Sequence, residues 1–168
     1  NILGIAYETV EGSDGGFPLL KPMSQIAGRL SIQIGAYFLQ TQHGGSGVLL
    51  GGIPGTMPGH VVVVGAGNSG SHAVQMAAGM GAHVTIMDIS LDRLRYLDDV
   101  MPANVTTVYS TPVNIRTRVR YADLVVGAVL VEGARAPLLV PRSYLKEMKE
   151  GSVIVDVAVD QGGCVETI

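Results

Sequence analysis

Residues 60–70 read His-Val-Val-Val-Val-Gly-Ala-Gly-Asn-Ser-Gly, and this stretch decides the fold. The run His60–Val64 predicts a strand, and its near-continuous apolar character is typical of a strand buried on both faces. Residues 68–80 predict a helix, which Gly81 ends. A glycine-rich turn therefore joins a buried strand directly to a helix, as in folds that alternate the two elements.

The same alternation continues toward the end of the chain. Further strands are expected at 83–87, 105–109, 123–129 and 153–157, and further helices at 91–100, from 111–112 onward and at 142–149. Five strands separated by four helical segments predict an α/β fold with a Rossmann-type, doubly wound parallel sheet.

The first 58 residues lead into this sheet. Residues 2–10 are largely apolar and predict a strand or an extended connection, and residues 11–16 predict a loop. From 22 to about 42, apolar side chains at helical spacing predict a long helix with Pro22 in its first turn. We therefore expect one domain, residues 1–168, in which 1–58 form a long helix and a connection.

Composition excludes several classes of protein. With 47% hydrophobic and 15% charged residues, the chain of 168 residues is neither disordered nor too short for a sizeable core. A net charge of −3 and the lack of a basic run give no reason to expect nucleic acid or an anionic membrane as partner. No apolar run reaches the length of about 18 residues that a membrane span needs.

The single cysteine, Cys164, excludes an internal disulfide framework and fits a reducing, cytoplasmic compartment. No His or Lys neighbours it in sequence, so we expect a buried or spectator thiol. The first residue is not Met and nothing in residues 1–4 indicates a signal peptide. Both ends look cut, and we expect the chain to be a piece of a longer protein.

Gly65, Gly67 and Gly70 form the spacing G-x-G-x-x-G between an expected strand and an expected helix, the context that a dinucleotide-binding turn requires. The first glycine permits a tight turn, the second lets the backbone approach a diphosphate, and the third lets the helix pack closely on the strand. Asn68 and Ser69 add side-chain donors at the positive end of the helix dipole. The alternative is an ordinary strand-to-helix turn in a glycine-rich chain.

Asp88 ends the second expected strand, 23 positions after Gly65. An acid near this position binds the adenosine ribose in dinucleotide-binding sheets, and it would repel a 2′-phosphate, which favours NAD over NADP. The alternative is that Asp88 caps the helix that begins near Ser90. The two roles are compatible, and together with the alternating pattern Asp88 indicates NAD as the cofactor.

Two carboxylates, Asp156 and Asp160, follow the fifth expected strand, at the sheet edge where ligands bind in such folds. For Asp156 we favour a role in anchoring the backbone at that edge. Asp160 precedes two glycines, so both a turn-forming aspartate and a functional carboxylate are compatible with its surroundings.

Whole segments carry a more specific signal than the glycine turn alone. They are Met-Ser-Gln-Ile-Ala-Gly-Arg-Leu at 23–30, Gly-Gly-Ile-Pro-Gly at 51–55, residues 93–98 and 122–130, and Asp-Val-Ala-Val-Asp-Gln-Gly-Gly-Cys at 156–164. In these segments, and over essentially its whole length, the chain resembles alanine dehydrogenase. The NAD-binding subunit of proton-translocating transhydrogenase is similar in the glycine turn and parts of the other segments. The ending Asp-Gln-Gly-Gly-Cys and the helix that carries Arg29-Leu30 favour alanine dehydrogenase.

The resemblance implies a role for each candidate site residue. Ser24 would reach the cofactor from the long helix, Asp88 would bind the ribose, and Arg93 stands where the family has a basic residue, often lysine, near the adenosine. Ser110 matches the position near the adenine. The cofactor-binding residues expected in this way are Ser24, Gly65, Gly67, Asn68, Ser69, Asp88, Arg93, Ser110, Ala128, Val129, Leu130, Val157 and Asp160.

By the same resemblance, the reaction is the reversible oxidative deamination of L-alanine to pyruvate and ammonia, with hydride transfer to NAD. Asp160 matches the family's catalytic carboxylate, and no metal is implied. In the family, a substrate domain supplies a lysine and a histidine that hold pyruvate. None of the histidines here, His43, His60, His72 and His83, matches that histidine.

The N-terminal and C-terminal parts of the substrate domain are therefore expected to be absent from this chain. By itself the chain would bind NAD and catalyse little. Family members are homo-oligomers, commonly hexamers, and the helix at 22–42 is a candidate contact surface, although its apolar face fits intramolecular core equally well.

Two other classes stay open. One is a non-catalytic NAD-binding module, such as a sensor or a transhydrogenase component. The other is a methyltransferase, whose fold is also doubly wound, although the complete glycine spacing at 65–70 together with Asp88 argues against it.

Overall fold

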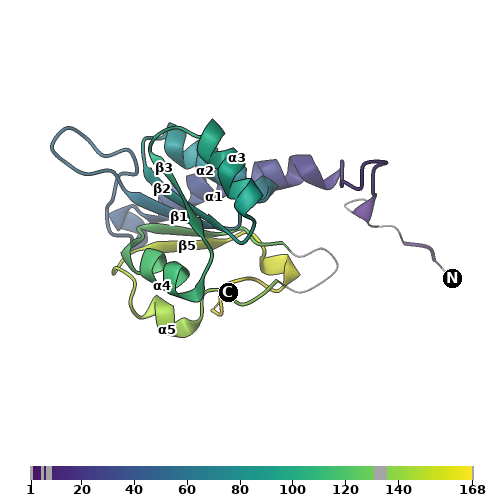
Figure 1. Ribbon diagram of the computed structural model, residues 1–168. Helices are drawn as coiled ribbons and strands as arrows, with labels where there is room; N and C mark the ends of the chain where they lie inside the picture. Colours follow the sequence, from purple (N-terminus) through teal and green to yellow (C-terminus); the bar gives the residue numbers. More distant parts are fainter. Residues whose placement is uncertain (1, 5, 7–8, 131–135, 168) are drawn as a thin grey trace.

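A five-stranded parallel sheet forms the centre of the protein in the computed structural model, which describes residues 2–4, 6, 9–130 and 136–167 (Figure 1). The strands are β1 (His60–Val64), β2 (His83–Asp88), β3 (Val105–Tyr109), β4 (Leu124–Gly127) and β5 (Val153–Asp156). Their order is β3-β2-β1-β4-β5, and all neighbouring strands are parallel. The predicted doubly wound sheet is confirmed, and its order reverses between β1 and β4, where such sheets bind ligands.

Helices cover both faces of the sheet. They are α1 (Leu20–Phe38), α2 (Asn68–Gly79), α3 (Leu91–Val100), α4 (Pro112–Tyr121) and α5 (Arg142–Leu145), with short 3₁₀ helices η2 (Thr41–His43) and η3 (Val159–Gln161). Figure 1 shows α1, α2 and α3 on one side of the sheet and α4 and α5 on the other. Apolar side chains of α1, α2 and α3 form one core cluster and those of α4 a second.

The four valines of β1 contribute side chains to both core clusters. Val61 and Val63 belong to the cluster beneath α1 and α2, whereas Val62 and Val64 belong to the cluster beneath α4. All four side chains are fully buried, because successive residues of a strand point to opposite faces and both faces are covered. The expectation that residues 61–64 form a strand buried on both faces is therefore confirmed.

The crossing of α1 over α2 depends on Gly28. A Cβ at Gly28 would lie 2.0 Å from the carbonyl oxygen of Ser69, so only glycine allows the two backbones to touch here. Ser24 precedes Gly28 by one helical turn on the same face of α1. The close crossing therefore brings Ser24 to the start of α2.

Some predicted boundaries are wrong. Helix α1 ends at Phe38 instead of near residue 42, because Gln40 is extended and residues 41–43 form η2. Helix α5 ends at Leu145 instead of 149, because i→i+3 hydrogen bonds replace helical ones from Tyr144 onward. Residues 5, 7 and 8 of the strand or extended connection expected at 2–10 lie outside the described residues, and no strand forms in the rest of that segment.

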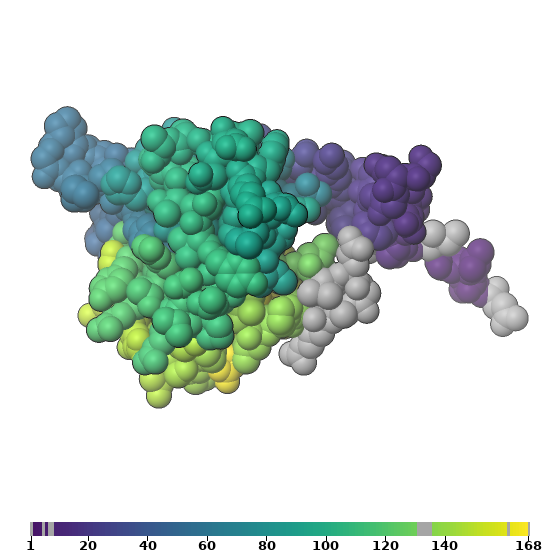
Figure 2. Space-filling model, viewed as in Figure 1, coloured from purple at the N-terminus to yellow at the C-terminus, as the bar shows by residue number. Residues whose placement is uncertain are grey.

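The outline of the protein is uneven. The segment before α1 extends from one side, and the connection around residues 50–58, blue in Figure 2, projects from the other. In the described part of the chain, no helix combines the length and apolar character needed to cross a bilayer.

Candidate functional site

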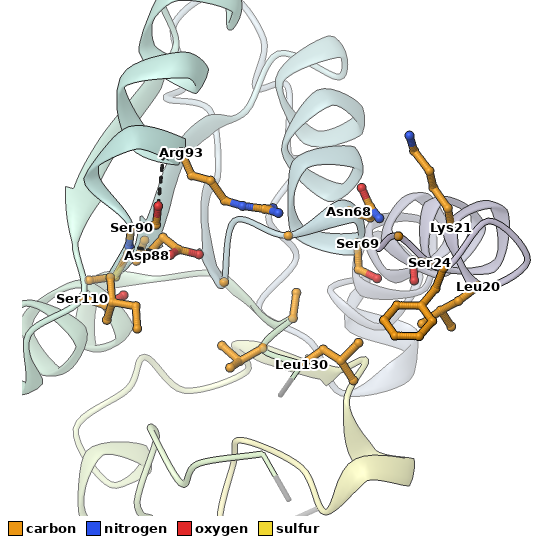
Figure 3. Close-up of a pocket in the computed structure, with 18 of the residues that line it drawn as sticks. Leu20, Lys21, Ser24, Asn68, Ser69, Asp88, Ser90, Arg93, Ser110 and Leu130 are labelled. Carbon is orange, nitrogen blue, oxygen red and sulfur yellow. Dashed lines mark hydrogen bonds between the residues drawn. The ribbon is translucent and has the colours of Figure 1, made fainter. Parts of the chain in front are cut away.

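Two adjoining cavities lie where the strands end at their carboxyl edge. Figure 3 shows residues that line the larger one. The larger, of about 750 Å³, is lined by the glycine turn after β1, the end of β2, Ser110 after β3, and Ala128 after β4. The smaller, of about 350 Å³, continues past Ala128 to Val157 and Asp160 after β5. They share Phe17, Leu20, Ser24, Ser69 and residues 128–130, so they form one elongated site.

The three glycines of the turn face three different surroundings. A Cβ at Gly65, whose φ is +104°, would lie 2.5 Å from the Ala128 carbonyl oxygen, and a Cβ at Gly70 would lie 1.8 Å from the Gly65 carbonyl oxygen. At Gly67 the φ is −68°, and the nearest contact of a Cβ would be Arg93 Nη1 at 3.8 Å. Gly65 and Gly70 are therefore required by the fold, whereas Gly67 leaves an open face toward the cavity.

The start of α2 offers unfilled hydrogen-bonding capacity. Gly67 is its N-cap, and no side chain of the described residues caps it. The first N–H groups of a helix have no intrahelical partner and lie at the positive end of its dipole. Asn68 and Ser69 line the larger cavity beside them. This arrangement suits an anionic group such as a diphosphate.

Asp88 joins the glycine turn to the start of α3. Its Oδ2 accepts the Ala66 N–H at 2.6 Å, and its Oδ1 accepts the Ser90 N–H at 2.8 Å. The N-cap of α3 is Ser90, whose hydroxyl accepts the Arg93 N–H at 3.3 Å, so the alternative in which Asp88 itself caps this helix is wrong. An ionised carboxylate has about four acceptor positions, which leaves two for a ribose diol.

The other predicted cofactor residues also line these cavities. Ser24 lines both, and Arg93 and Ser110 line the larger one. Residues 128–130 lie between them, and Val157 and Asp160 line the smaller one. All thirteen predicted residues thus lie around one site, although their contacts with a cofactor stay a prediction.

Asp156 anchors the backbone, as favoured from the sequence. Its buried carboxylate accepts the N–H groups of Ala158 at 2.9 Å, Cys164 at 2.7 Å and Val165 at 3.0 Å. These bonds fix the turn that carries Asp160 to the smaller cavity. Burial, reinforced by the charge of Asp156, raises the pKa of the Cys164 thiol to about 12, so this cysteine is a buried, protonated side chain, as expected.

None of the four histidines lines either cavity. His60 lies at the opposite edge of the sheet, where its Nε2 pairs with Thr85 Oγ1 at 2.9 Å, and burial lowers its pKa. His72 accepts a hydrogen bond from Arg29 Nε at 3.3 Å, and burial followed by the charge of Arg29 lowers its pKa. Within the described ranges, no group of three or more His, Cys, Asp and Glu side chains is arranged for a metal ion.

Sequence reasoning missed the part of the wall that precedes Ser24. Phe17, which precedes α1, and Leu20 and Lys21 in its first turn line the larger cavity. A signal existed, because Leu20, Ser24 and Gly28 follow at intervals of four and so share one helical face. Pro137 and Leu139 also line the cavity, and the bridge between Val140 and Val165 holds their segment there. That long-range contact has no local sequence signal.

Comparisons with known proteins agree with this geometry. Residues 31–168 match the family described as alanine dehydrogenase/PNT, C-terminal domain. An alanine dehydrogenase from Methanococcus maripaludis is 58% identical over 167 residues, which are 99% of this chain and 45% of that relative. A solved structure of an L-alanine dehydrogenase superposes with a TM-score of 0.94 at 58% identity, covering 98% of this chain and 45% of that one.

A transhydrogenase structure from Sinorhizobium meliloti superposes with a TM-score of 0.76 at 24% identity, covering 89% of this chain and 44% of that one. At that identity the likeness shows a common fold. The chain spans slightly less than half the length of the alanine dehydrogenases that it matches.

Proposed function

The chain belongs to the alanine dehydrogenase/PNT C-terminal domain family, and from that premise we propose that it is the NAD-binding part of an L-alanine dehydrogenase. The observation that carries the proposal is the open face of Gly67 at the uncapped start of α2. A diphosphate could approach the backbone at Gly67, whereas Gly65 and Gly70 pack closely against other backbone atoms.

The lining of the site fits a dinucleotide along its length. The N–H groups at 67–69 would bind the diphosphate, and the free acceptor positions of Asp88 would bind the adenosine ribose. Ser110 follows β3, on the far side of β2 from the glycine turn after β1, and it would lie near the adenine. The nicotinamide end would lie in the smaller cavity, between residues 128–130 and Val157.

Bound NAD supplies a nicotinamide ring that accepts a hydride in the reversible oxidative deamination of L-alanine to pyruvate and ammonia. Asp160 lines the cavity proposed for that ring and is exposed at the start of η3. Its carboxylate is suited to holding water or taking a proton beside the reacting carbon. The groups that hold the carboxylate of the substrate would come from the part of an alanine dehydrogenase that this chain does not match.

The alternative reading as a transhydrogenase component has weaker support, because the likeness to that structure is 24% against 58% for L-alanine dehydrogenase. Alanine-dependent reduction of NAD by the longer protein would separate the two. In that protein we expect Asp160→Asn to lower kcat more than it weakens NAD binding. An unaltered kcat would remove Asp160 from the reaction.

The binding half of the proposal can be tested on this chain. Fluorescence titration should show binding of NADH and much weaker binding of NADPH. Asp88→Ala should raise the Kd for NADH roughly 10- to 100-fold, since it removes charge-assisted hydrogen bonds. Asp99→Ala, a change of an exposed carboxylate on α3, is the control and should bind like the wild type. Equal binding by the Asp88 variant would refute the ribose assignment.

A further inference from the structure

Ala66, between the first two glycines of the turn, is held by side chains on both its amide and its carbonyl. Asp88 Oδ2 accepts its N–H at 2.6 Å. Its carbonyl oxygen accepts two hydrogen bonds, from Arg93 Nη1 at 2.8 Å and from Ser71 Oγ at 3.1 Å. Side chains from the end of β2, from α3 and from α2 thus meet at one residue of the turn, and Figure 3 shows Arg93 reaching from α3 toward the start of α2.

These contacts fix the direction of the next amide. The Ala66 carbonyl and the Gly67 N–H belong to one planar, trans peptide unit and point to opposite sides. Arg93 and Ser71 hold the carbonyl, and so they also set the direction of the Gly67 N–H. If this peptide rotated, the Ala66 carbonyl oxygen would take the place of the Gly67 N–H and would repel an anion bound there.

Glycine at 67 makes such a restraint necessary. Because Gly67 has no Cβ, its backbone is freer than that of a residue with a side chain, and rotation of the preceding peptide costs little energy. The open face that lets a ligand approach therefore also removes the usual steric restraint on the loop. Hydrogen bonds to the Ala66 carbonyl supply that restraint from outside the loop.

We propose that Arg93 and Ser71 are positioning residues that lock the Ala66–Gly67 peptide in the orientation that binds a diphosphate. The inference rests on the proposed function and deepens it, because it gives Arg93 an action through the loop that is separate from a contact with the adenosine. Ser71 distinguishes the two actions, since it is not among the residues that line the two cavities and its hydroxyl donates to the Ala66 carbonyl of the loop.

The test uses Arg93→Met and Ser71→Ala in this chain, with Arg95→Met as control. Arg95 is on the same helix, and its exposed guanidinium pairs with Asp92. In the ligand-free protein, the hydrogen-exchange rate of the Ala66 N–H, followed by NMR, measures how firmly the loop is held. Titration with NADH at several salt concentrations measures binding. We expect Arg93→Met to raise the Kd about tenfold and Ser71→Ala severalfold, in line with charged and neutral hydrogen bonds.

Both variants should also speed exchange of the Ala66 N–H without ligand, while Arg95→Met changes neither quantity. Wild-type exchange at Ala66 in Arg93→Met, or wild-type NADH affinity in Ser71→Ala, would overturn the inference. If the Kd for NADH of Arg93→Met depends less on salt concentration than that of the wild type, and Ser71→Ala binds NADH like the wild type, Arg93 acts by direct attraction of the charged ligand instead. Failure of the wild-type chain to bind NADH would overturn the proposed function. The exchange measurement uses the ligand-free protein, so it tests the restraint on the loop independently of that result.

Discussion

The substitution Gly67→Ala separates the fold from the proposed binding of NAD. A φ of −68° is ordinary for alanine, and among the residues that the structure describes the added Cβ would meet Arg93 Nη1 alone, at 3.8 Å, an ordinary van der Waals distance. Replacing glycine at a compatible position restricts the unfolded chain and stabilises a protein by about 0.4–1 kcal/mol. For a chain of this size we expect Tm to rise by roughly 1–4 °C.

Binding should respond in the opposite direction. The added methyl group fills the open face, where a phosphate oxygen would need to come within about 2.9 Å of a backbone nitrogen. Loss of one charge-assisted hydrogen bond costs about 1.5–3 kcal/mol, which raises the Kd roughly 10- to 100-fold. Loss of two bonds would raise it further.

Calorimetric titration with NADH and thermal unfolding of the same samples measure both effects. Gly70→Ala is the contrasting variant, because its Cβ would lie 1.8 Å from the Gly65 carbonyl oxygen and should destabilise the fold. A folded Gly67→Ala protein that binds NADH as tightly as the wild type would show that no diphosphate approaches this residue, and the reasoning would fail.

Three further predictions concern stability and reactivity. Gly28→Ala should lower Tm strongly by forcing α1 away from Ser69, whereas Gly79→Ala, with open space around its Cβ, should leave Tm unchanged or raised; a tolerated Gly28→Ala would contradict the backbone contact. Burial lowers the folded-state pKa of His60, so on acidification the unfolded chain binds the proton first. The contribution of His60 to the free energy of unfolding is therefore complete above about pH 6.5 and declines below it. Urea titrations from pH 7.5 to 5 should show this decline flattened in His60→Gln, and equal slopes would refute it. Cys164, with its pKa raised to about 12, should react with iodoacetamide at pH 8 roughly a hundredfold more slowly in the folded than in the urea-unfolded protein; comparable rates would contradict its burial.

Local sequence patterns predicted the sheet because its elements are set by short-range physics. The valine run at 61–64 indicates a strand buried on both faces, and the glycine spacing at 65–70 indicates the turn that follows it. Each of these signals lies within a few residues of the structure it predicts. The carboxyl edge of the sheet then follows from topology, which is why the sequence also predicts that Asp88 and Asp160 lie near one site.

Contacts between distant segments were not accessible in this way. The hydrogen bond from Arg93 to the Ala66 carbonyl joins residues 27 positions apart and depends on how α3 packs beside the turn. The touching backbones at Gly28 and Ser69 depend likewise on the crossing of two helices. For Gly28 the sequence shows only a small residue in a helix, with no indication of the surface it meets.

A crystal of this chain soaked with NADH tests the central claim most directly. The account predicts density for a dinucleotide along the carboxyl edge, its diphosphate within hydrogen-bond distance of the amides at 67–69 and its adenosine ribose on Asp88. A site that stays empty at saturating NADH, or a dinucleotide bound at the opposite edge near His60, would contradict it.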